Sequence, residues 1–407
     1  MDVVIVSEFC EDFSKYDNDR FLYIAKMLCK KHDVELITSS FRHTVKKHRT
    51  KPVVQWPFKI TFLREPGYLK NICLRRFYSH FIWGRNVGRY LKSRTRPDVI
   101  YCAVPSLTSA NEVATYCKKN GTRFIIDVQD LWPEAFQMVF HVPVVSNIVF
   151  LPFYLLADRI YKLADHVVAV SKTYAKRIVR VRDSKKATVV FLGTNLDDFD
   201  RNVRNNIGLQ KNRKELWIGY CGTLGASYDI DMVIYALWNI RKSGEIPPKF
   251  IVMGEGDRKE EFEKLAKEKN VDVYFTGRIS YDNMCSILLK CDMVVNPIHD
   301  GSAGSIINKH ADYAACGLPV LNTQNSAEYR QLVDQYEMGF NCDNEFELAE
   351  RIKILTENER LRAQMGVNAR KCAEDKFDRN KTYKRIECLT SYSERGIINN
   401  EIHCSFF

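Results

Sequence analysis

The chain has 407 residues, of which 45% are apolar, and a net charge of +11. This length exceeds what one compact core usually holds and predicts two domains, and the apolar content excludes a disordered chain. Thirteen cysteines are scattered without a CxxC pair or a Cys/His cluster at zinc spacing, so we expect free thiols in a reducing cytosol.

The first part of the chain alternates short apolar runs, typical of buried strands, with runs of helical periodicity. The opening run has no basic segment before it, which disfavours a signal peptide. This alternation predicts parallel βαβ units with right-handed crossovers. Strands are expected at 2–7, 33–39, 98–104 and the start of 123–134, helices at 20–31 and 106–121, and helix, strand and helix across 158–179.

Residues 41–96 hold fifteen Lys and Arg residues against a single acid, Glu65, together with many aromatic residues. Basic and aromatic residues together suit either nucleic acid, through phosphate contacts and base stacking, or an anionic membrane surface. A solvated basic face over ordinary core aromatics is the remaining alternative. No zinc-finger or RNP-like signature accompanies the segment, which disfavours nucleic acid.

Residues 135–157 contain no Asp, Glu, Lys or Arg, and their length would allow a membrane span. Pro143 and Pro152 interrupt the run, and it lies between elements of one globular domain. We therefore favour buried or interfacial helices over a span.

A polar stretch at 200–215 precedes a second alternation of strands and helices, so the predicted domains are 1–203 and 204–380, with a tail, 381–407, that crosses back to the first. In the second domain three glycine turns each follow a strand and precede a helix. Backbone N–H groups and helix dipoles at such turns favour phosphate, and no Walker A or GxGxxG motif is present. The turns are Gly222–Gly225, Gly254–Gly256 and Gly301–Gly304.

A helix counted from Ser305 places Ser305, Asn308, Lys309 and Asp312 on one face. Lys309 would reach a phosphate oxygen, and Asp312 would accept hydrogen bonds from two vicinal hydroxyls, as in a ribose. An ordinary surface lysine and a surface acid beside it are the alternatives.

The motifs "FTGRISYDNM", "INKHADYAACGLPVL" and "IDVQDLWPEAF" resemble those of the retaining family 4 glycosyltransferases, in particular the members that extend bacterial capsular, exopolysaccharide or O-antigen chains on lipid carriers. The resemblance covers nearly the whole chain. It implies an α/β GT-B fold, in which two Rossmann-like doubly wound parallel-sheet domains face a central cleft. The first domain would bind the acceptor and the second the nucleotide-sugar.

By this resemblance Lys309 contacts the diphosphate and Asp312 holds the ribose. Gly304 stands where many relatives have a glutamate that binds the transferred sugar, and Gln129-Asp130 stands where many have a His-Asp pair. The expected donor-binding set is Gly222, Thr223, Glu255, Arg278, Ile279, Gly304, Ser305, Lys309 and Asp312.

Asp130 and Lys309 are the expected catalytic residues, with Glu134 as a second carboxylate that would meet the acceptor. Diphosphate charge can be stabilised by a lysine and backbone amides, so we expect neither a metal nor another cofactor beyond the nucleotide-sugar. The acidic stretch at 17–20 is interpreted as a helix N-cap. The residues expected to meet the acceptor or the membrane are Glu134, Arg75, Arg76, Trp83 and Arg85.

The predicted function is transfer of a sugar from a nucleotide-sugar, with a UDP-sugar as the expected donor, to a lipid-linked saccharide on a polyprenyl diphosphate. The expected location is the cytoplasm, peripheral on the inner face of the cell membrane, with no nucleic-acid partner. A sugar-nucleotide epimerase of the GT-B fold and a binding subunit without catalysis remain as alternatives.

Overall fold

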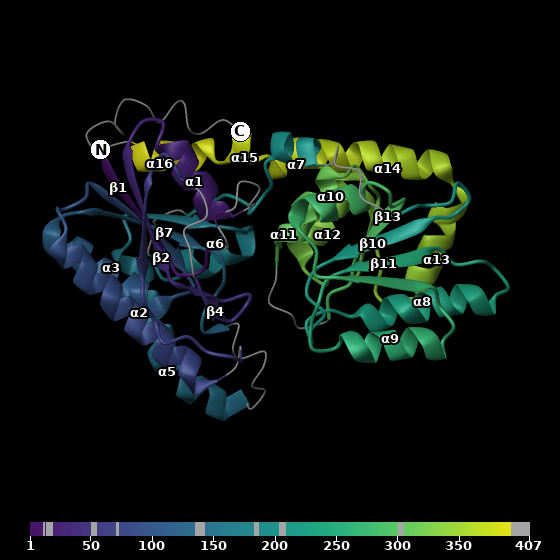
Figure 1. Ribbon diagram of the computed structural model, residues 1–407, viewed down its shortest axis with the longest axis horizontal. Helices are drawn as coiled ribbons and strands as arrows, with labels where there is room; N and C mark the ends of the chain where they lie inside the picture. Colours follow the sequence, from purple (N-terminus) through teal and green to yellow (C-terminus); the bar gives the residue numbers. More distant parts are fainter. Residues whose placement is uncertain are drawn as a thin grey trace. The chain divides into compact units, whose positions relative to one another are not determined.

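The computed structural model describes residues 1–10, 13, 19–49, 55–70, 73–134, 143–182, 187–202, 209–299 and 305–391. The chain divides into two compact units, one formed by Met1–Phe191 and Lys381–Phe407 and the other by Leu192–Asn380. Each unit is built on its own parallel sheet (Figure 1).

The first unit contains a sheet of seven strands in the order β5-β2-β1-β6-β7-β8-β9, all parallel. Its central strands are continuous apolar runs because helices cover both faces. A short antiparallel pair, β3 with β4, stands apart from it. The strands are β1 (Asp2–Ser7), β2 (Asp33–Ser39), β3 (Phe41–Arg42), β4 (Lys47–His48), β5 (Lys59–Leu63), β6 (Val99–Val104), β7 (Arg123–Val128), β8 (His166–Ala169) and β9 (Thr188–Val189).

Helices lie on both faces of this sheet, with α2, α3 and α5 stacked together and α1 beside α16 (Figure 1). Asp19 begins α1 by accepting hydrogen bonds from the N–H groups of Phe21 and Leu22, which confirms the N-cap interpretation of 17–20. The helices are α1 (Arg20–Leu28), α2 (Leu74–Ser93), α3 (Leu107–Asn120), α5 (Pro143–Leu163), α6 (Lys172–Val179) and α16 (Lys384–Ser391).

The second unit contains a six-stranded parallel sheet in the order β12-β11-β10-β13-β14-β15. The strand order reverses between β10 and β13, and ligands of such sheets bind at the carboxyl ends of the strands beside that switch point. The strands are β10 (Trp217–Cys221), β11 (Lys249–Met253), β12 (Val273–Gly277), β13 (Met293–Asn296), β14 (Val320–Asn322) and β15 (Gly339–Asn341).

In this unit α13 packs against α8, and α14 packs against α11 and α12 on the other side of the sheet (Figure 1). A π-helical turn, Ala373–Phe377, and α15 (Arg379–Thr382) follow α14. The helices are α7 (Leu196–Asn202), α8 (Ile230–Lys242), α9 (Lys259–Glu268), α10 (Tyr281–Leu288), α11 (Asn308–Ala315), α12 (Ala327–Tyr336), α13 (Glu345–Glu357) and α14 (Glu359–Cys372).

The division at Phe191/Leu192 falls earlier than the expected boundary at 203/204. The reason is that α7 belongs to the second unit, where it packs on α10 and α11. Both carboxylate oxygens of its Asp200 accept hydrogen bonds from the Arg370 guanidinium at 2.8 Å. After Asn380 the chain belongs to the first unit, where the Tyr383 hydroxyl accepts a hydrogen bond from buried Arg20.

The cysteines that the structure describes are all free thiols, in line with the expectation of no disulfide scaffold. Of the uncharged stretch 135–157, residues 143–157 form part of α5, whereas 135–142 lie outside the described residues. None of the described helices combines the length and the hydropathy that a membrane crossing requires.

Candidate functional site

Two glycine turns, at the carboxyl ends of β10 and β11, pack directly against each other through their backbones. Gly222 donates its N–H to the Met253 carbonyl at 3.0 Å. A Cβ on Gly254 would lie 1.8 Å from the Gly222 oxygen, and one on Gly256 would lie 2.1 Å from the Leu224 oxygen. Only glycine fits at these two positions, so the turns form one continuous backbone surface with few side chains.

Lys309, in the first turn of α11, lies directly against this surface. The Lys309 Nζ would be 2.5 Å from a Cβ on Gly222, and it lies 3.8 Å from the centroid of the Tyr228 ring and 3.2 Å from the Tyr220 hydroxyl. The side chain is buried, which lowers the pKa of the Lys309 ammonium to about 7. Among the described residues no carboxylate forms an ion pair with it, so two aromatic rings are what offsets its charge.

Asp312 lies one helical turn further along α11 and is also buried. The Tyr281 hydroxyl donates to Asp312 Oδ1 at 2.7 Å, and the Thr194 hydroxyl lies 3.0 Å from that of Tyr281. Burial raises the pKa of Asp312 to about 6. Tyr281 opens α10 immediately after the Arg278-Ile279 loop, so it connects the predicted base-reading loop to the predicted ribose carboxylate. The sequence did not point to this tyrosine.

The prediction that Ser305 belongs to the Lys309 helix is wrong. Ile307 is extended, with φ −108° and ψ 164°, and α11 begins only at Asn308. The Ser305 hydroxyl donates instead to Glu328 Oε2 at 2.8 Å. Gly304 and the rest of the third glycine turn lie outside the described residues.

Buried amides hold the segment that leads into α11. Asn296 at the end of β13 donates to the Asn322 side chain at the end of β14 at 2.8 Å, and also to Gln324 Oε1 at 3.1 Å. Gln324 in turn donates to the Ser305 carbonyl at 3.0 Å. An asparagine that ends an apolar strand, twice in succession, is the sequence signal that could have identified this network.

The remaining donor-side predictions fall on the rim of the turns. Glu255 forms an ion pair with Lys259 at 2.8 Å, and its Oε1 would be 2.9 Å from a Cβ on Gly277. Thr223 and Arg278 are exposed, and Ile279 is half-buried. Glu255 therefore lies beside the start of the loop that carries Arg278 and Ile279.

In the first unit, the predicted acceptor carboxylates follow β7. The Trp132 indole N–H donates to Asp130 Oδ2 at 3.2 Å, and burial raises the pKa of Asp130. Glu134 forms an ion pair with Arg177, which also pairs with Asp158 at 2.8 Å. Of these two carboxylates, Glu134 forms an ion pair, whereas Asp130 forms none with the residues that the structure describes.

Besides Glu134, the other four residues expected to face the acceptor or a membrane all lie in α2, and they differ in exposure. Trp83 is fully buried, so its prediction as a surface residue is wrong, because it lies on the face of α2 that packs into the unit. Arg76 is half-buried, with its guanidinium 4.9 Å from the centroid of the Trp132 ring. Arg75 and Arg85 are exposed.

A buried carboxylate that sequence reasoning missed lies at the carboxyl end of β1. Glu8 is 3% exposed, and neither of its carboxyl oxygens has a hydrogen-bond partner within the described residues. Its neighbour His80, 3.6 Å away, is neutral because burial lowers the pKa of that imidazole to about 3. Burial, with Glu65 nearby, raises the pKa of Glu8 well above its ordinary value.

Two family models match the chain, one over each half. Residues 20–198 match the model described as glycosyltransferase family 4, and residues 204–372 match the model described as glycosyl transferases group 1. An uncharacterized glycosyltransferase of Methanocaldococcus jannaschii is 25% identical over 236 residues, which cover 57% of this chain. The matched part spans 59% of that relative's own length, less than two thirds.

Solved structures share the fold. The sucrose-phosphate synthase of Thermosynechococcus elongatus superposes with a TM-score of 0.72 at 15% identity, covering 98% of this chain and 99% of that one. Anabaena HepE, solved in complex with UDP, gives a TM-score of 0.66 at 15% identity, with 96% and 100% covered. With both halves matched and two parallel-sheet units in place, the chain is a GT-B protein of the glycosyltransferase family 4 type.

Proposed function

We propose that the chain is a retaining glycosyltransferase that moves a hexosyl group from a nucleotide-sugar, a UDP-sugar, to a saccharide carried on a polyprenyl diphosphate. The two family models and the glycosyltransferase relative support the reaction class. The UDP in the complex of the structural neighbour HepE supports the choice of donor.

The observation that carries this proposal is the buried ammonium of Lys309 beside the bare backbone of Gly222. A buried cation with no carboxylate partner is costly, and an anion that enters the site offsets that cost. The diphosphate of a nucleotide-sugar supplies such an anion. Backbone N–H groups of the paired turns would donate to it, apart from those of Gly222 and Leu224, which already donate to Met253 and Glu255.

Asp312 would then hold the ribose. Tyr281 orients its carboxylate, and with a pKa of about 6 this group is mostly ionised at neutral pH. An ionised carboxylate accepts hydrogen bonds from both ribose hydroxyls. The exposed Arg278 and its neighbour Ile279 belong to the loop that would contact the base.

The chemistry follows from charge. Sugar transfer leaves negative charge on the departing diphosphate, and Lys309 with the turn amides would stabilise it without a metal ion. In the first unit, Asp130 would orient the acceptor hydroxyl and take its proton, since burial raises the pKa of this carboxylate and so makes it a stronger base than an exposed aspartate. We assign the enzyme to the synthesis of bacterial surface polysaccharide, at the inner face of the cell membrane.

Two rival functions share the donor site, namely a sugar-nucleotide epimerase and a binding subunit without turnover. The test is to incubate the full chain with a panel of nucleotide-sugars and a membrane lipid extract, and to analyse the sugar products. Transfer of sugar to lipid supports the proposal. Isomerised sugar would establish the epimerase, and nucleotide-sugar bound without turnover would establish the binding subunit.

A further inference from the structure

We propose that the outward faces of α2 and α5 form a docking surface for a bilayer that contains anionic phospholipid. Apolar side chains in the first half of each helix would enter the lipid, and cations in the second half would contact headgroup phosphates. This inference deepens the proposed function, since it names the surface that brings the enzyme to a lipid-linked acceptor.

Among the side chains that the structure describes, the outward face of α5 is apolar from Ile148 to Leu155. Ile148, Leu151 and Leu155 recur at spacings of three and four residues, so they lie on one side of the helix. Each is more than half exposed. A helix that faces only water carries polar residues on this side, and a contiguous apolar patch marks an interaction surface.

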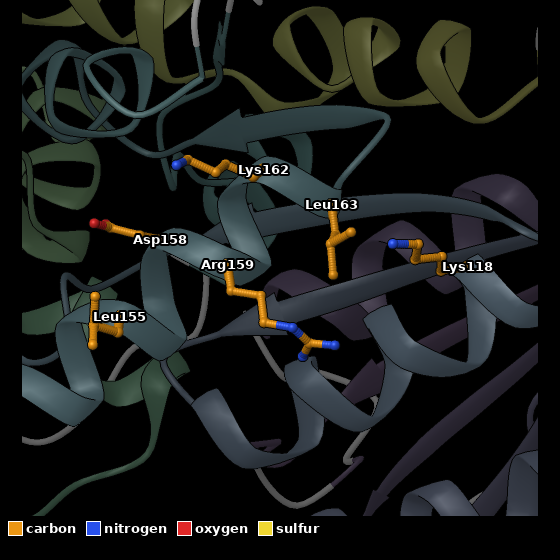
Figure 2. Close-up of a pocket in the computed structure, with 6 residues that line it drawn as sticks. All are labelled: Lys118, Leu155, Asp158, Arg159, Lys162 and Leu163. Atoms are coloured by element: carbon orange, nitrogen blue, oxygen red, sulfur yellow. The ribbon is translucent and has the colours of Figure 1, made fainter.

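The same face of α5 becomes cationic over its second half. Arg159 and Lys162 continue the stripe, and Lys118 reaches toward it from α3. Together they line an open pocket of about 410 Å³ (Figure 2). Its one acid, Asp158, is already paired with Arg177, so the pocket keeps its positive charge. Cations beside apolar side chains are the pattern of an interfacial helix.

α2 repeats this arrangement. Leu74, Tyr78 and Phe81 are each more than half exposed in its first half. Its second half carries three exposed cations on the continuation of that face, namely Arg85, Arg89 and Lys92. An exposed tyrosine between apolar and basic residues suits the depth of lipid headgroups.

The two stripes lie together. The ring centroids of Phe77 in α2 and Phe153 in α5 are 5.8 Å apart, which joins the apolar halves of the helices. Toward their basic halves both helices contact α3, since Arg85 approaches Glu112 at 3.7 Å and Arg159 donates to Thr115 at 3.3 Å. The result is one surface whose apolar and cationic parts are separated along the helices. Figure 1 shows α2 and α5 on the same side of the first unit.

This separation favours a membrane over other partners. Nucleic acid needs cations and stacking rings but has no use for exposed aliphatic side chains such as Ile148, Leu151 and Leu74. Anionic lipid needs both parts, because its acyl region accepts the aliphatic groups and its phosphates attract the cations.

The experiment measures flotation of the full chain with phosphatidylcholine vesicles, with and without phosphatidylglycerol, in low and high salt and without any donor sugar. Leu151→Asp/Leu155→Asp should weaken binding about tenfold or more, since charged groups are excluded from the acyl region. The matched control is Ile246→Asp/Val367→Asp in the second unit, whose two apolar side chains are more exposed than Leu151 and Leu155 and which should bind like the parent. Thermal unfolding checks that both variants are folded.

Arg159→Gln/Lys162→Gln should weaken binding to the anionic vesicles by about 25-fold, at roughly fivefold for each cation, and leave the weak binding to phosphatidylcholine unchanged. Equal binding by parent and α5 variants would overturn the inference. So would a concentration-dependent dimer that the Leu151→Asp/Leu155→Asp variant abolishes, because the face would then belong to a second copy. UDP binding is measured separately on the parent and on the same variants. It tests the proposed function independently of the docking surface.

Discussion

The carboxyl edges of the two sheets bury different kinds of ionisable group. At the edge of the second sheet, Lys309 is a buried cation held by two tyrosine rings beside a glycine turn. At the edge of the first sheet, Glu8 is a buried carboxyl group beside a neutral histidine. The first arrangement attracts an anion, whereas the second favours a protonated carboxyl that offers one hydrogen-bond donor to a neutral, hydroxyl-bearing molecule.

Under the proposed function, this contrast corresponds to different ligands at the two edges. The second edge would bind the nucleoside diphosphate and the first edge the saccharide. In both units, burying the ionisable group costs stability, and a bound ligand would offset that cost. Variants that remove the group should therefore weaken ligand binding without weakening the fold.

The largest expected effect is that of Lys309→Met, which keeps the volume of the side chain and removes its charge. Sugar transfer should fall by about 10² to 10³, because the leaving diphosphate loses its cation. The thermal midpoint should stay the same or rise, since a buried charge is removed. Steady-state kinetics and thermal unfolding of both proteins check this.

Lys264→Met is the matched control, because Lys264 is an exposed lysine of the same unit, in α9. It should keep the parental rate. A Lys309→Met enzyme with parental turnover would place the diphosphate elsewhere.

A second test addresses the paired turns. Gly254→Ala places a Cβ 1.8 Å from the Gly222 carbonyl oxygen, so the turns must separate, and the affinity for UDP should fall about tenfold or more. Gly225→Ala is the control, since its Cβ would lie 3.8 Å from its nearest neighbour. Calorimetric UDP titrations compare the two variants, and equal affinities would contradict the role of the turns.

The smallest expected effect is a change of pH dependence in the first unit. The pKa of Glu8 is raised in the folded protein, so the folded state holds its proton after the unfolded chain has lost it. The free energy of unfolding should therefore fall as the pH rises above the ordinary glutamate value, by up to about 1.4 kcal/mol per pH unit, until the raised pKa is passed.

Glu8→Gln should remove this slope and leave the unit more stable than the parent at neutral pH, as measured by urea unfolding across a pH series. Glu112→Gln changes a carboxylate that is ion-paired at the surface, and it should keep the parental slope. A parental slope in Glu8→Gln would show that Glu8 is satisfied in solution.

Much of the fold was predictable because parallel strands buried on both faces are apolar runs, as in "DVVIVS" and "DMVVNPI". Within 41–96, the charge count concealed the helix α2. Trp83, Val87 and Leu91 recur every four residues and are buried, whereas Tyr78 and Arg85 belong to its exposed face. A composition count adds the residues of both helix faces together, whereas the helical periodicity distinguishes the buried face from the exposed one.

For the candidate site, the sequence placed Lys309 and Asp312 on one helix face because they lie three residues, about one helical turn, apart, and the structure places both in α11. It did not foresee Tyr228 over Lys309 or Tyr281 on Asp312. These contacts join elements that are distant in the chain, and no local pattern encodes them. The late start of α11 has the same origin, since Gln324, on the far side of β14, holds the Ser305 carbonyl.

The central claim is that a diphosphate binds on Lys309, and proton uptake tests it most directly. With a pKa of about 7, the Lys309 amine is mostly neutral at pH 8 in the free protein. A bound diphosphate restores its charge, so UDP titrated at pH 8 in buffers of different ionisation enthalpy should take up about one proton per site. Lys309→Met should abolish this proton uptake. In the parent at pH 6 the Lys309 amine is already mostly charged, so the uptake there should be small. An enthalpy independent of the buffer at pH 8, or uptake that persists in Lys309→Met, would contradict the account.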